Sequence, residues 1–434
     1  MADTGSITLK KLRQCHGNVT LPGSKSIANR ALLMAALCGA GQSTVLTNVL
    51  RSDDTQRMLE ALGDLGVTVT IAEHDPTHIT VSGCEGKWPQ HPAALDLGNA
   101  GTAMRPLLAV LSATLQGNRC ILTGDARMQE RPIAALIESL RAGGAHIDCL
   151  QQEGYPPLEI SGGLTSGMIE IDGTESSQYI SALLMALPLL ETDSVLKLTG
   201  TVVSWPYIEL TLSMLERFGI VVHQICRQEF MIPGQQVYQS PGVYWVEGDA
   251  SAASYWLAAG ALGGGPLTVH GVGRHSIQGD VKFADYLAQM GAQVTIEEHS
   301  ITVKKGVLRA LDADLNAIPD AAMTFATLAL FAQGTTHIRN IANWRIKETD
   351  RLQAMAAELR KVGAHVVETE EAISITPPAH LQHGIIDTYN DHRMAMSFAL
   401  LGFSEVGVTI LDPNCCRKTY PNFFTEFCQI TQSS

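Results

Sequence analysis

Hydrophobic and polar positions along the chain follow a pattern that recurs six times. Apolar helical runs lead into short strand-like runs such as TVLTN, CILTG and LKLTG, each ending in a turn-forming residue. These endings recur every 69 to 76 residues, at Asn48, Gly124, Gly200, Gly271, Asn340 and Asp412. Such a period is too long for a solenoid repeat and predicts a small α/β subdomain.

A second series lies between the first. It consists of amphipathic helices that end at a glycine and lead into a strand, as in ALGDLGVTV and LERFGIVV. The glycines recur every 72 to 78 residues, at Gly66, Gly144, Gly219, Gly291 and Gly363. Two independent series with one period predict six units, each with two helices, two main strands and a further short strand.

Six units divide naturally into two domains of three. We predict one domain over residues 20–244, holding the first three units, and one over residues 1–19 plus 245–434, holding the last three. Pro241 and Gly242 mark a plausible crossing point between them. The length of 434 residues agrees with more than one domain, because a single hydrophobic core rarely grows so large.

Composition narrows the class of protein. The chain is 45% apolar and has no uninterrupted apolar stretch of the ~20 residues that span a membrane. Its N-terminus resembles neither a secretory signal nor a transit peptide, so we expect a cytoplasmic protein. Nine cysteines without CxxC pairs suggest neither a zinc site nor a disulfide framework. The net charge of −13 disfavours a nucleic-acid partner.

Cations stand where the predicted helices begin, which is an unfavourable place for them. Ser, Asp and Asn at these starts are explained by capping, but Lys and Arg oppose the helix macrodipole. The cations concerned are Lys25, Arg30, Arg105, Arg131, Lys347, Arg351, Arg393 and Lys418. A common cause is a bound anion, because helix N-termini and basic side chains both favour phosphate and carboxylate. The sequence therefore predicts ligands with several negative charges.

The segment WRIKETDRLQAM combines like charges with a carboxyl group. On a helix, Lys347 and Arg351 would share one face, and Glu348 would lie one turn from Arg351. One reading is a solvated face with an ordinary Glu–Arg pair. The other is a carboxyl group tuned by neighbouring cations for proton transfer.

Two further segments place acidic residues at helix starts. Asp320 precedes a small, apolar helix and is either an N-cap or a general base. In NDHRMAM, Asn390 or Asp391 explains the cap but leaves His392 and Arg393 unexplained.

Long motifs carry a resemblance to a known family. LPGSKSIANRALL, LGNAGTAMRPL, NWRIKETDR and YNDHRMAM together resemble the 5-enolpyruvylshikimate-3-phosphate (EPSP) synthase family over nearly the whole chain. The resemblance implies an α/β fold of two similar domains, each of three βαβαββ units arranged as an inside-out α/β barrel. It also implies an active site in the interdomain cleft, which closes on the substrates.

The same resemblance implies a transferase of the shikimate pathway of aromatic amino acid biosynthesis. The enolpyruvyl group of phosphoenolpyruvate passes to the 5-hydroxyl of shikimate 3-phosphate by addition and elimination, and phosphate is released. No metal or organic cofactor is implied, and a monomer is expected. Gly101 and Pro106 match the glyphosate-sensitive class, so inhibition by glyphosate is expected.

Site residues follow from the matched motifs. The implied catalytic residues are Lys25, Asp320 and Glu348. Shikimate 3-phosphate would contact Lys25, Ser26, Arg30, Ser176, Ser177, Ser204, Tyr207, Asp320, Asn343 and Lys347. Phosphoenolpyruvate would contact Lys25, Gly101, Arg131, Gln178, Arg351, Arg393 and Lys418. The supporting residues would be Asn99, Thr102, Arg105 and His392.

Two alternatives stay open. The first is the related enolpyruvyl transferase of UDP-N-acetylglucosamine, whose active loop carries a reactive cysteine; the comparable stretch GDARMQERP has none. The second is a non-catalytic protein that binds phosphorylated metabolites. Trp205 departs from the family pattern, because a basic residue is frequent at that position, and this change would alter the rim of the site.

Overall fold

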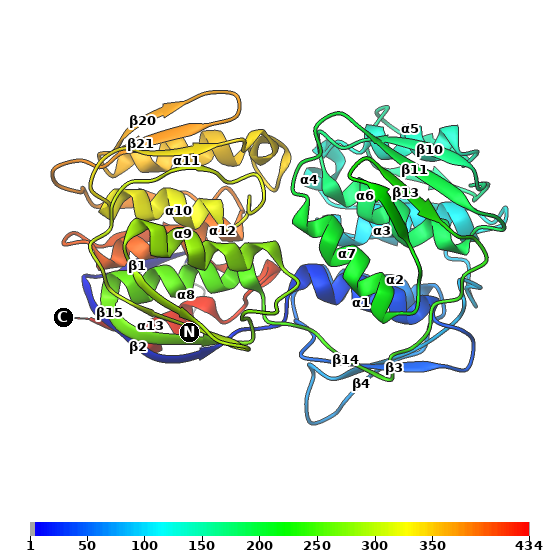
Figure 1. Cartoon of the computed structure of the whole chain (residues 1–434), viewed down its shortest axis with the longest axis horizontal. Helices are drawn as coiled ribbons and strands as arrows, with labels where there is room; N and C mark the ends of the chain where they lie inside the picture. Colours follow the sequence, from blue (N-terminus) through cyan, green and yellow to red (C-terminus); the bar gives the residue numbers. More distant parts are fainter. Residues whose placement is uncertain (1–4, 434) are drawn as a thin grey trace. The chain divides into compact units, whose positions relative to one another are not determined.

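The computed structural model describes residues 5–433, which form two compact units. We call Gly23–Val246 the continuous unit, because one stretch of chain builds it. The split unit consists of the residues up to Pro22 together with those from Glu247 onward. Figure 1 shows both units as mixtures of helices and small sheets, which confirms the predicted α/β class.

Three four-stranded sheets form the continuous unit. Their strand orders are β14-β3-β5-β4, β6-β7-β9-β8 and β10-β11-β13-β12. The strands are β3 (Ser43–Thr47), β4 (Val69–Ile71), β5 (Ile79–Ser82), β6 (Ala94–Asp96), β7 (Cys120–Thr123), β8 (Ile147–Cys149), β9 (Leu158–Ile160), β10 (Met168–Asp172), β11 (Ser194–Thr199), β12 (His223–Cys226), β13 (Glu229–Ile232) and β14 (Val243–Trp245). The helices are α1 (Lys25–Leu37), α2 (Asp53–Asp64), α3 (Gly101–Thr114), α4 (Ala126–Glu130), α5 (Ala134–Ala142), α6 (Ser177–Ala186), α7 (Pro206–Arg217) and the 3₁₀ turn η1 (Leu187–Leu189).

The split unit repeats this plan with strands from both segments. Its sheets have the orders β18-β19-β21-β20, β16-β17-β15-β2-β24 and β1-β23-β22. The strands are β1 (Ser6–Leu9), β2 (Leu12–Thr20), β15 (Gly264–His270), β16 (Gln293–Ile296), β17 (Ser300–Lys304), β18 (Asp312–Asp314), β19 (Thr336–Arg339), β20 (His365–Glu368), β21 (Ile373–Thr376), β22 (Gly384–Ile386), β23 (Val408–Leu411) and β24 (Thr431–Ser433). The helices are α8 (Ala250–Gly263), α9 (Phe283–Met290), α10 (Ala322–Leu328), α11 (Arg351–Lys361), α12 (His392–Phe398) and α13 (Phe423–Ile430), with 3₁₀ turns η2 (Gly279–Lys282), η3 (Ala329–Phe331), η4 (Ala342–Ile346), η5 (Ala399–Phe403) and η6 (Pro413–Lys418).

The sheets share one local topology, which confirms the βαβαββ pattern. In the second sheet, β6 and β7 pair in parallel, with Ala94 opposite Ile121, and β9 and β8 continue antiparallel. A parallel pair needs a crossover, and α3 supplies it. The order β14-β3-β5-β4 keeps the plan, although its first strand is the last one of the continuous unit in sequence.

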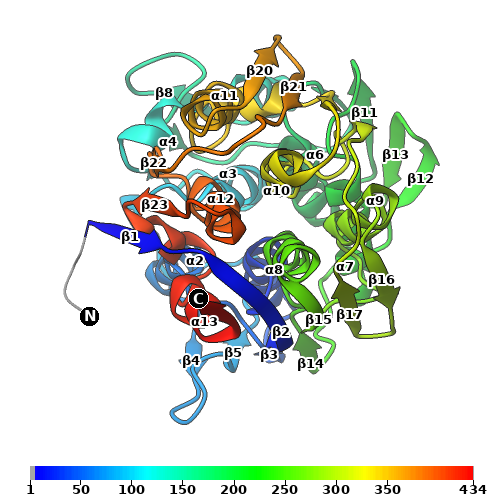
Figure 2. The ribbon, with the colours of Figure 1, turned by 90° about the vertical axis from the view of Figure 1, so that its left-hand side faces the viewer.

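Helices lie inside and sheets outside. The first helix of each repeat is buried almost all round, as in α3 and α8, whereas second helices such as α2 bury one face. An apolar helix surrounded by other elements accounts for this burial, and Figure 2 shows α8, α10 and α12 inside the ring of strands of the split unit. The sheets remain separate, so the strands of the described residues do not close into one barrel.

Residues with a left-handed backbone occupy nearly all the predicted strand-ending and helix-ending positions. All five predicted helix-ending glycines have positive φ, between 73° and 114°. Five of the six strand-ending residues are also left-handed: Asn48, Gly200, Gly271, Asn340 and Asp412. The exception is Gly124, where a Cβ would lie 2.2 Å from the Gly98 carbonyl oxygen, so close approach requires glycine there instead.

Four of the repeats also contain a turn that is closed by an aspartate side chain, a feature that was not predicted. At the end of a repeat's first strand, the Oδ1 of an aspartate accepts a hydrogen bond from the backbone N–H two residues later. The pairs are Asp96–Gly98 (2.9 Å), Asp172–Thr174 (2.8 Å), Asp314–Asn316 (3.0 Å) and Asp387–Tyr389 (3.0 Å). These turns reverse the chain just before the first helices begin.

The helix predicted through Lys347 was wrong, and of the two interpretations of Asp320 the N-cap was wrong. Lys347 lies between η4 and α11 in extended conformation, and α11 begins only at Arg351, so the two cations do not share a helical face. Asp320 does not cap α10, whose N-cap is Ala321 without a side-chain hydrogen bond. In both places the side chains lie in ion pairs with residues distant in the sequence.

Two glycines with the same φ should lose different amounts of unfolding free energy when each is replaced by alanine. Gly291 and Gly17 share a φ of 114°, but a Cβ at 291 would lie 2.4 Å from the Val307 carbonyl oxygen, whereas a Cβ at 17 meets nothing within 4 Å. Gly17→Ala should cost about 1–2 kcal/mol of unfolding free energy from the left-handed backbone alone. Gly291→Ala should cost about 1–3 kcal/mol more, because the carbonyl must move. Urea unfolding of both variants measures this; equal midpoints would contradict the overlap.

Candidate functional site

Arg351 is the centre of an ion cluster in the split unit. Its side chain is buried, with 0% of the residue exposed, at the first position of α11. Nε donates to Asp391 Oδ2 at 2.7 Å, Nη1 to Asp320 Oδ1 at 2.8 Å and Nη2 to Glu348 Oε2 at 2.8 Å. One guanidinium therefore fixes three carboxylates, using the planar fork of donors that only arginine offers.

Three more cations surround these carboxylates. Arg393 Nη2 lies 2.9 Å from Asp320 Oδ2, and Lys347 Nζ lies 3.7 Å from Asp320 Oδ1. Lys418 Nζ lies 3.9 Å from Glu348 Oε1. We call these residues the Arg351 cluster: Asp320, Lys347, Glu348, Arg351, Asp391, Arg393 and Lys418.

The cations determine the ionisation of Asp320. Burial alone would raise the pKa of this carboxyl, but Arg393, Lys347 and Arg351 outweigh burial and hold the pKa well below its ordinary value. Burial lowers the pKa of Arg351, yet Asp391, Glu348 and Asp320 more than compensate and raise it overall. Both groups are therefore charged at neutral pH.

Local structure explains how these side chains meet. Buried Trp344 in η4 donates from its indole nitrogen to the Pro319 carbonyl at 2.7 Å, which fixes the segment before Asp320 against η4. Asp350 caps α11 by accepting from the Gln353 N–H at 3.0 Å, so Arg351 begins the helix. Asp391 caps α12 in the same way, by accepting from the Arg393 N–H at 2.9 Å.

The remaining predicted residues of the split unit lie close by. His392 is fully buried beside Asp391, with Nδ1 3.6 Å from Asp391 Oδ1. Asn343 is buried in η4. Lys418 ends η6, and α13 begins only at Phe423, so this cation does not stand at a helix start as expected.

A second group of predicted residues lies in the continuous unit. Lys25, the first residue of α1, places Nζ 3.2 Å from Asp54 Oδ2, and both side chains are largely buried. Asn29 donates to Thr102 Oγ1 at 2.7 Å and so links α1 to α3. Asp54 was not predicted as a site residue, although its place at the start of the second helix of the first repeat was a usable signal.

Gly101 lies against two guanidinium groups. A Cβ at this position would lie 2.7 Å from Arg105 Nη1 and 3.0 Å from Arg131 Nη2. Arg131 Nη1 donates to Asn99 Oδ1 at 3.0 Å, and Arg105 Nη2 donates to the Pro132 carbonyl at 3.4 Å. The absent side chain therefore lets two cations approach the N-terminus of α3.

Arg30 is buried among helices. Nε donates to Thr211 Oγ1 at 2.9 Å, Nη2 to Ser181 Oγ at 3.2 Å and Nη1 to the Ser26 carbonyl at 3.0 Å. Burial lowers its pKa to about 10. These bonds tie α1 to α6 and α7, a structural role that the sequence did not indicate.

Polar residues gather at the N-termini of α6 and α7. Ser176 caps α6 by accepting from the Gln178 N–H at 3.2 Å, and Ser177 follows as the first helical residue. Ser204 is left-handed, with a φ of 53°, and stands just before α7, whose first turn carries Tyr207. Trp205 donates to Glu209 and lies 5.3 Å below the Arg227 guanidinium.

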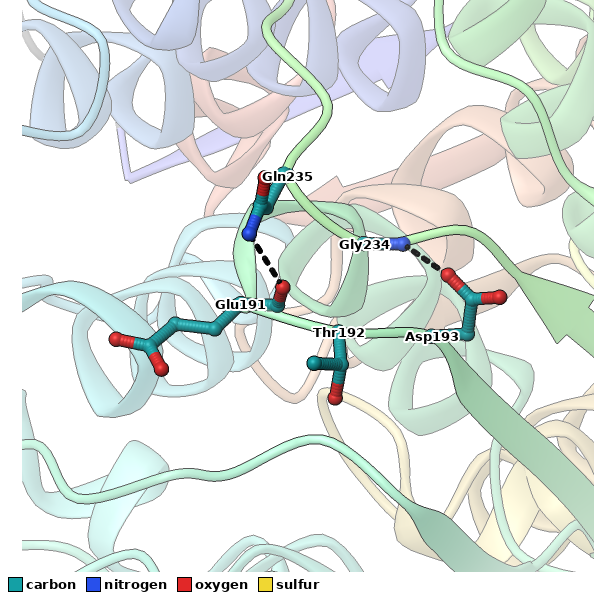
Figure 3. A pocket seen from close by; sticks show the side chains of 5 residues that line it. All are labelled: Glu191, Thr192, Asp193, Gly234 and Gln235. Atoms are coloured by element: carbon teal, nitrogen blue, oxygen red, sulfur yellow. Dashed lines mark hydrogen bonds between the residues drawn. The ribbon is translucent and has the colours of Figure 1, made fainter.

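Residues 5–433 offer few other candidate sites. No group of three or more His, Cys, Asp or Glu side chains in this part of the chain is arranged to hold a metal ion. None of its helices is long and apolar enough to cross a membrane. A surface depression is lined by Glu191, Thr192, Asp193, Gly234 and Gln235 (Figure 3). Its lining carries no cation, so it does not suit an anionic ligand.

Comparison with known proteins agrees with this site chemistry. The family model described as EPSP synthase (3-phosphoshikimate 1-carboxyvinyltransferase) matches residues 9–427. A 3-phosphoshikimate 1-carboxyvinyltransferase of Idiomarina loihiensis is 57% identical over 431 residues, covering 99% of each chain. One from Klebsiella pneumoniae subsp. pneumoniae is 56% identical, covering 98% of this chain and 99% of the relative.

Solved structures give the same result for the fold. An EPSP synthase from Acinetobacter baumannii superposes with a TM-score of 0.81 at 27% identity, covering 98% of this chain and 97% of that one. The enolpyruvyl transferase NikO from Streptomyces tendae, at 17% identity and a TM-score of 0.77, shares the fold and covers 99% of each chain. With a family model over nearly the whole chain and relatives above half identity, the chain belongs to the EPSP synthase family of transferases.

Proposed function

We propose that this enzyme transfers the carboxyvinyl group of phosphoenolpyruvate to the 5-hydroxyl of shikimate 3-phosphate and releases phosphate. The observation that carries the proposal is the Arg351 cluster, in which one buried guanidinium holds Asp320 and Glu348 at 2.8 Å each. Addition followed by elimination needs two proton-transfer groups at fixed positions, surrounded by cations for phosphate and carboxylate.

The roles divide between the two carboxyl groups. Asp320 takes the proton of the 5-hydroxyl as its oxygen attacks C2 of phosphoenolpyruvate. Glu348, in its protonated form, delivers a proton to the methylene carbon, giving a tetrahedral intermediate. It then takes a proton back from the resulting methyl group as the C2–O bond to phosphate breaks, and the double bond reforms. The proton that Asp320 took passes to the leaving phosphate, so both carboxyl groups return to their starting state while the carboxyvinyl group is transferred.

The low pKa of Asp320 bears on its role as base. A carboxyl held ionised by three cations is available to accept a proton at every working pH, but it is a weak base. Binding of anionic substrates beside Lys347 and Arg393 offsets part of their positive charge, which raises the basicity of Asp320 when a substrate is present. Lys25, paired with Asp54, is the second candidate for the base.

Substrate contacts follow the matched motifs. For shikimate 3-phosphate we propose Lys25, Ser26, Arg30, Ser176, Ser177, Ser204, Tyr207, Asp320, Asn343 and Lys347. For phosphoenolpyruvate we propose Lys25, Gly101, Arg131, Gln178, Arg351, Arg393 and Lys418. Among these, Arg30 and Arg351 already make three hydrogen bonds or ion pairs each within the protein, so we assign them mainly to holding the site in shape.

We further propose a monomeric cytoplasmic enzyme that glyphosate inhibits. Support for inhibition comes from Gly101 and Pro106, which match the sensitive class, and from the two guanidinium groups beside Gly101.

Loss of the carboxyl of Glu348 should abolish turnover. In Glu348→Gln, phosphate release with both substrates should fall by about 100-fold or more, because the proton donor and acceptor at the methylene carbon is gone. The exposed residue Glu138 provides the control variant Glu138→Gln, which should match the wild type. Release without shikimate 3-phosphate, or release with a UDP-N-acetylglucosamine acceptor alone, would contradict the proposed acceptor.

A methyl group at position 101 should weaken phosphoenolpyruvate and glyphosate together. In Gly101→Ala, Arg105 or Arg131 must move from its place, so KM for phosphoenolpyruvate should rise roughly tenfold while KM for shikimate 3-phosphate stays within about twofold. The glyphosate concentration for half inhibition should rise as well. Gly63→Ala at the end of α2 is the control, because its Cβ meets nothing within 4 Å. An unchanged KM for phosphoenolpyruvate would remove Gly101 from the proposed site.

Asp280 should make stability depend on pH. Burial, together with the charge of Asp320, raises its pKa from 3.8 to about 7, against a hydrogen bond from Ser251. The folded protein then holds a proton that the unfolded chain releases, so stability should fall as pH rises from about 4 to about 7. Urea midpoints of Asp280→Asn should fall less over this range, whereas exposed Asp285→Asn should follow the wild type. Parallel curves for the Asp280 variant and the wild type would contradict this assignment.

A further inference from the structure

Glu358 is a buried carboxylate that the reaction itself does not use. It lies on α11 seven residues after Arg351, two helical turns along the same face. None of its side chain is exposed. A charge buried to this degree is costly unless it is fully paired, so its partners indicate what it is for.

The partners of Glu358 belong mainly to one loop. Oε1 accepts from the Tyr389 hydroxyl at 2.7 Å, and Oε2 accepts from the Asp387 N–H at 3.1 Å. Lys361 Nζ, on the same helix, lies 2.7 Å from Oε2 and supplies the opposite charge. The carboxylate therefore binds the loop 387–390 at two points, the backbone N–H of Asp387 and the side-chain hydroxyl of Tyr389.

This loop is strained. Tyr389 and Asn390 are consecutive non-glycine residues with φ of 52° and 53°. Each left-handed residue costs about 1–2 kcal/mol, and such conformations persist only where the surroundings determine them. Asp387 Oδ1 accepts from the Tyr389 N–H, and the Asp391 N–H donates to the Thr388 carbonyl at 2.8 Å, so the loop closes on itself.

The loop delivers two members of the Arg351 cluster. Asp391 follows Asn390 directly, caps α12 and binds Arg351 Nε, and Arg393 reaches Asp320 at 2.9 Å. Helix α11 thus binds this part of the chain through two side chains. Arg351 binds Asp391, and Glu358 binds Asp387 and Tyr389. If the hydrogen bonds of Glu358 to the loop are lost, the strained turn is free to relax, and Asp391 and Arg393 move with it.

We propose that Glu358, acting through Tyr389 and Asp387, is a positioning residue for the Arg351 cluster. The inference rests on the proposed function, because it assigns Arg393 to the anion site. Glu358 itself touches no substrate. It keeps the left-handed turn in place, and the turn keeps Arg393 directed at its anion.

Two substitutions test this role. In Glu358→Gln the amide oxygen can still accept from the Asp387 N–H, but the NH2 group then faces the Tyr389 hydroxyl, which must turn to accept, and the charge that pairs with Lys361 is lost. Tyr389→Phe removes only the hydroxyl, from a residue that is 38% exposed, and serves if the first variant fails to fold. Glu368→Gln is the matched control, because Glu368 pairs with Arg360 of the same helix and this pair joins α11 to β20 rather than to the loop.

Steady-state kinetics with both substrates give the readout. We expect KM for phosphoenolpyruvate to rise about tenfold in Glu358→Gln and about threefold in Tyr389→Phe, with kcat changing less and KM for shikimate 3-phosphate within about twofold. The double variant should be no worse than Glu358→Gln alone, because both changes release the same turn. Glu368→Gln should match the wild type.

Opposite results are equally clear. If urea midpoints fall but both KM values stay unchanged, Glu358 serves stability alone and the inference is wrong. Additive effects in the double variant would also overturn it, because the two residues would then act separately. An inactive wild type would instead refute the proposed function, so failure of the two proposals is distinguishable.

Discussion

A single buried guanidinium holds the working part of the split unit together. Arg351 is fully enclosed and binds carboxylates from three segments: Asp320 before α10, Glu348 before α11, and Asp391 before α12. Removing one partner from a buried pair costs about 3–5 kcal/mol, because the remaining charge is left without compensation. Three separate segments are therefore constrained relative to one another by one side chain.

That constraint is also electrostatic. Asp391 and Glu348 offset the charge of Arg351. Arg393 and Lys347, together with Arg351, lower the pKa of Asp320 and so keep this carboxyl ionised. Asp280 of the same unit retains its proton to a higher pH, chiefly because it is buried and also because of the charge of Asp320. Burial and nearby charges thus shift the pKa values of two aspartates of one unit in opposite directions.

The periodic features of this structure were predictable from sequence, and the tertiary contacts were not. Gly66, Gly219 and Gly291 are left-handed as their position after a helix indicated, because only local backbone sterics decide this. The helix predicted through Lys347 was wrong: this residue is extended, and its Nζ lies 3.7 Å from Asp320 Oδ1. No local pattern encodes such a contact.

Some features that were not predicted could nevertheless have been recognised in the sequence. The turn aspartates Asp96, Asp172, Asp314 and Asp387 stand at one phase of the repeat and could have been found by aligning the units. Asp54 could have been paired with Lys25 by the same reasoning, since both stand at helix starts of the first repeat. Glu358 had no such signal, because its role depends on a loop thirty residues away that only the folded chain brings near.

The path of the chain has a consequence for synthesis on the ribosome. Every strand of the continuous unit lies between residues 23 and 246, and β14 completes its first sheet, so this unit has all its parts once about half the chain has emerged. The split unit differs, because β2 pairs with β15 and β1 pairs with β23, with Ser6 opposite Leu411. Its first strands are thus made long before their partners. The leading segment must stay unpaired, and open to chaperones, while a whole unit is synthesised and folds behind it.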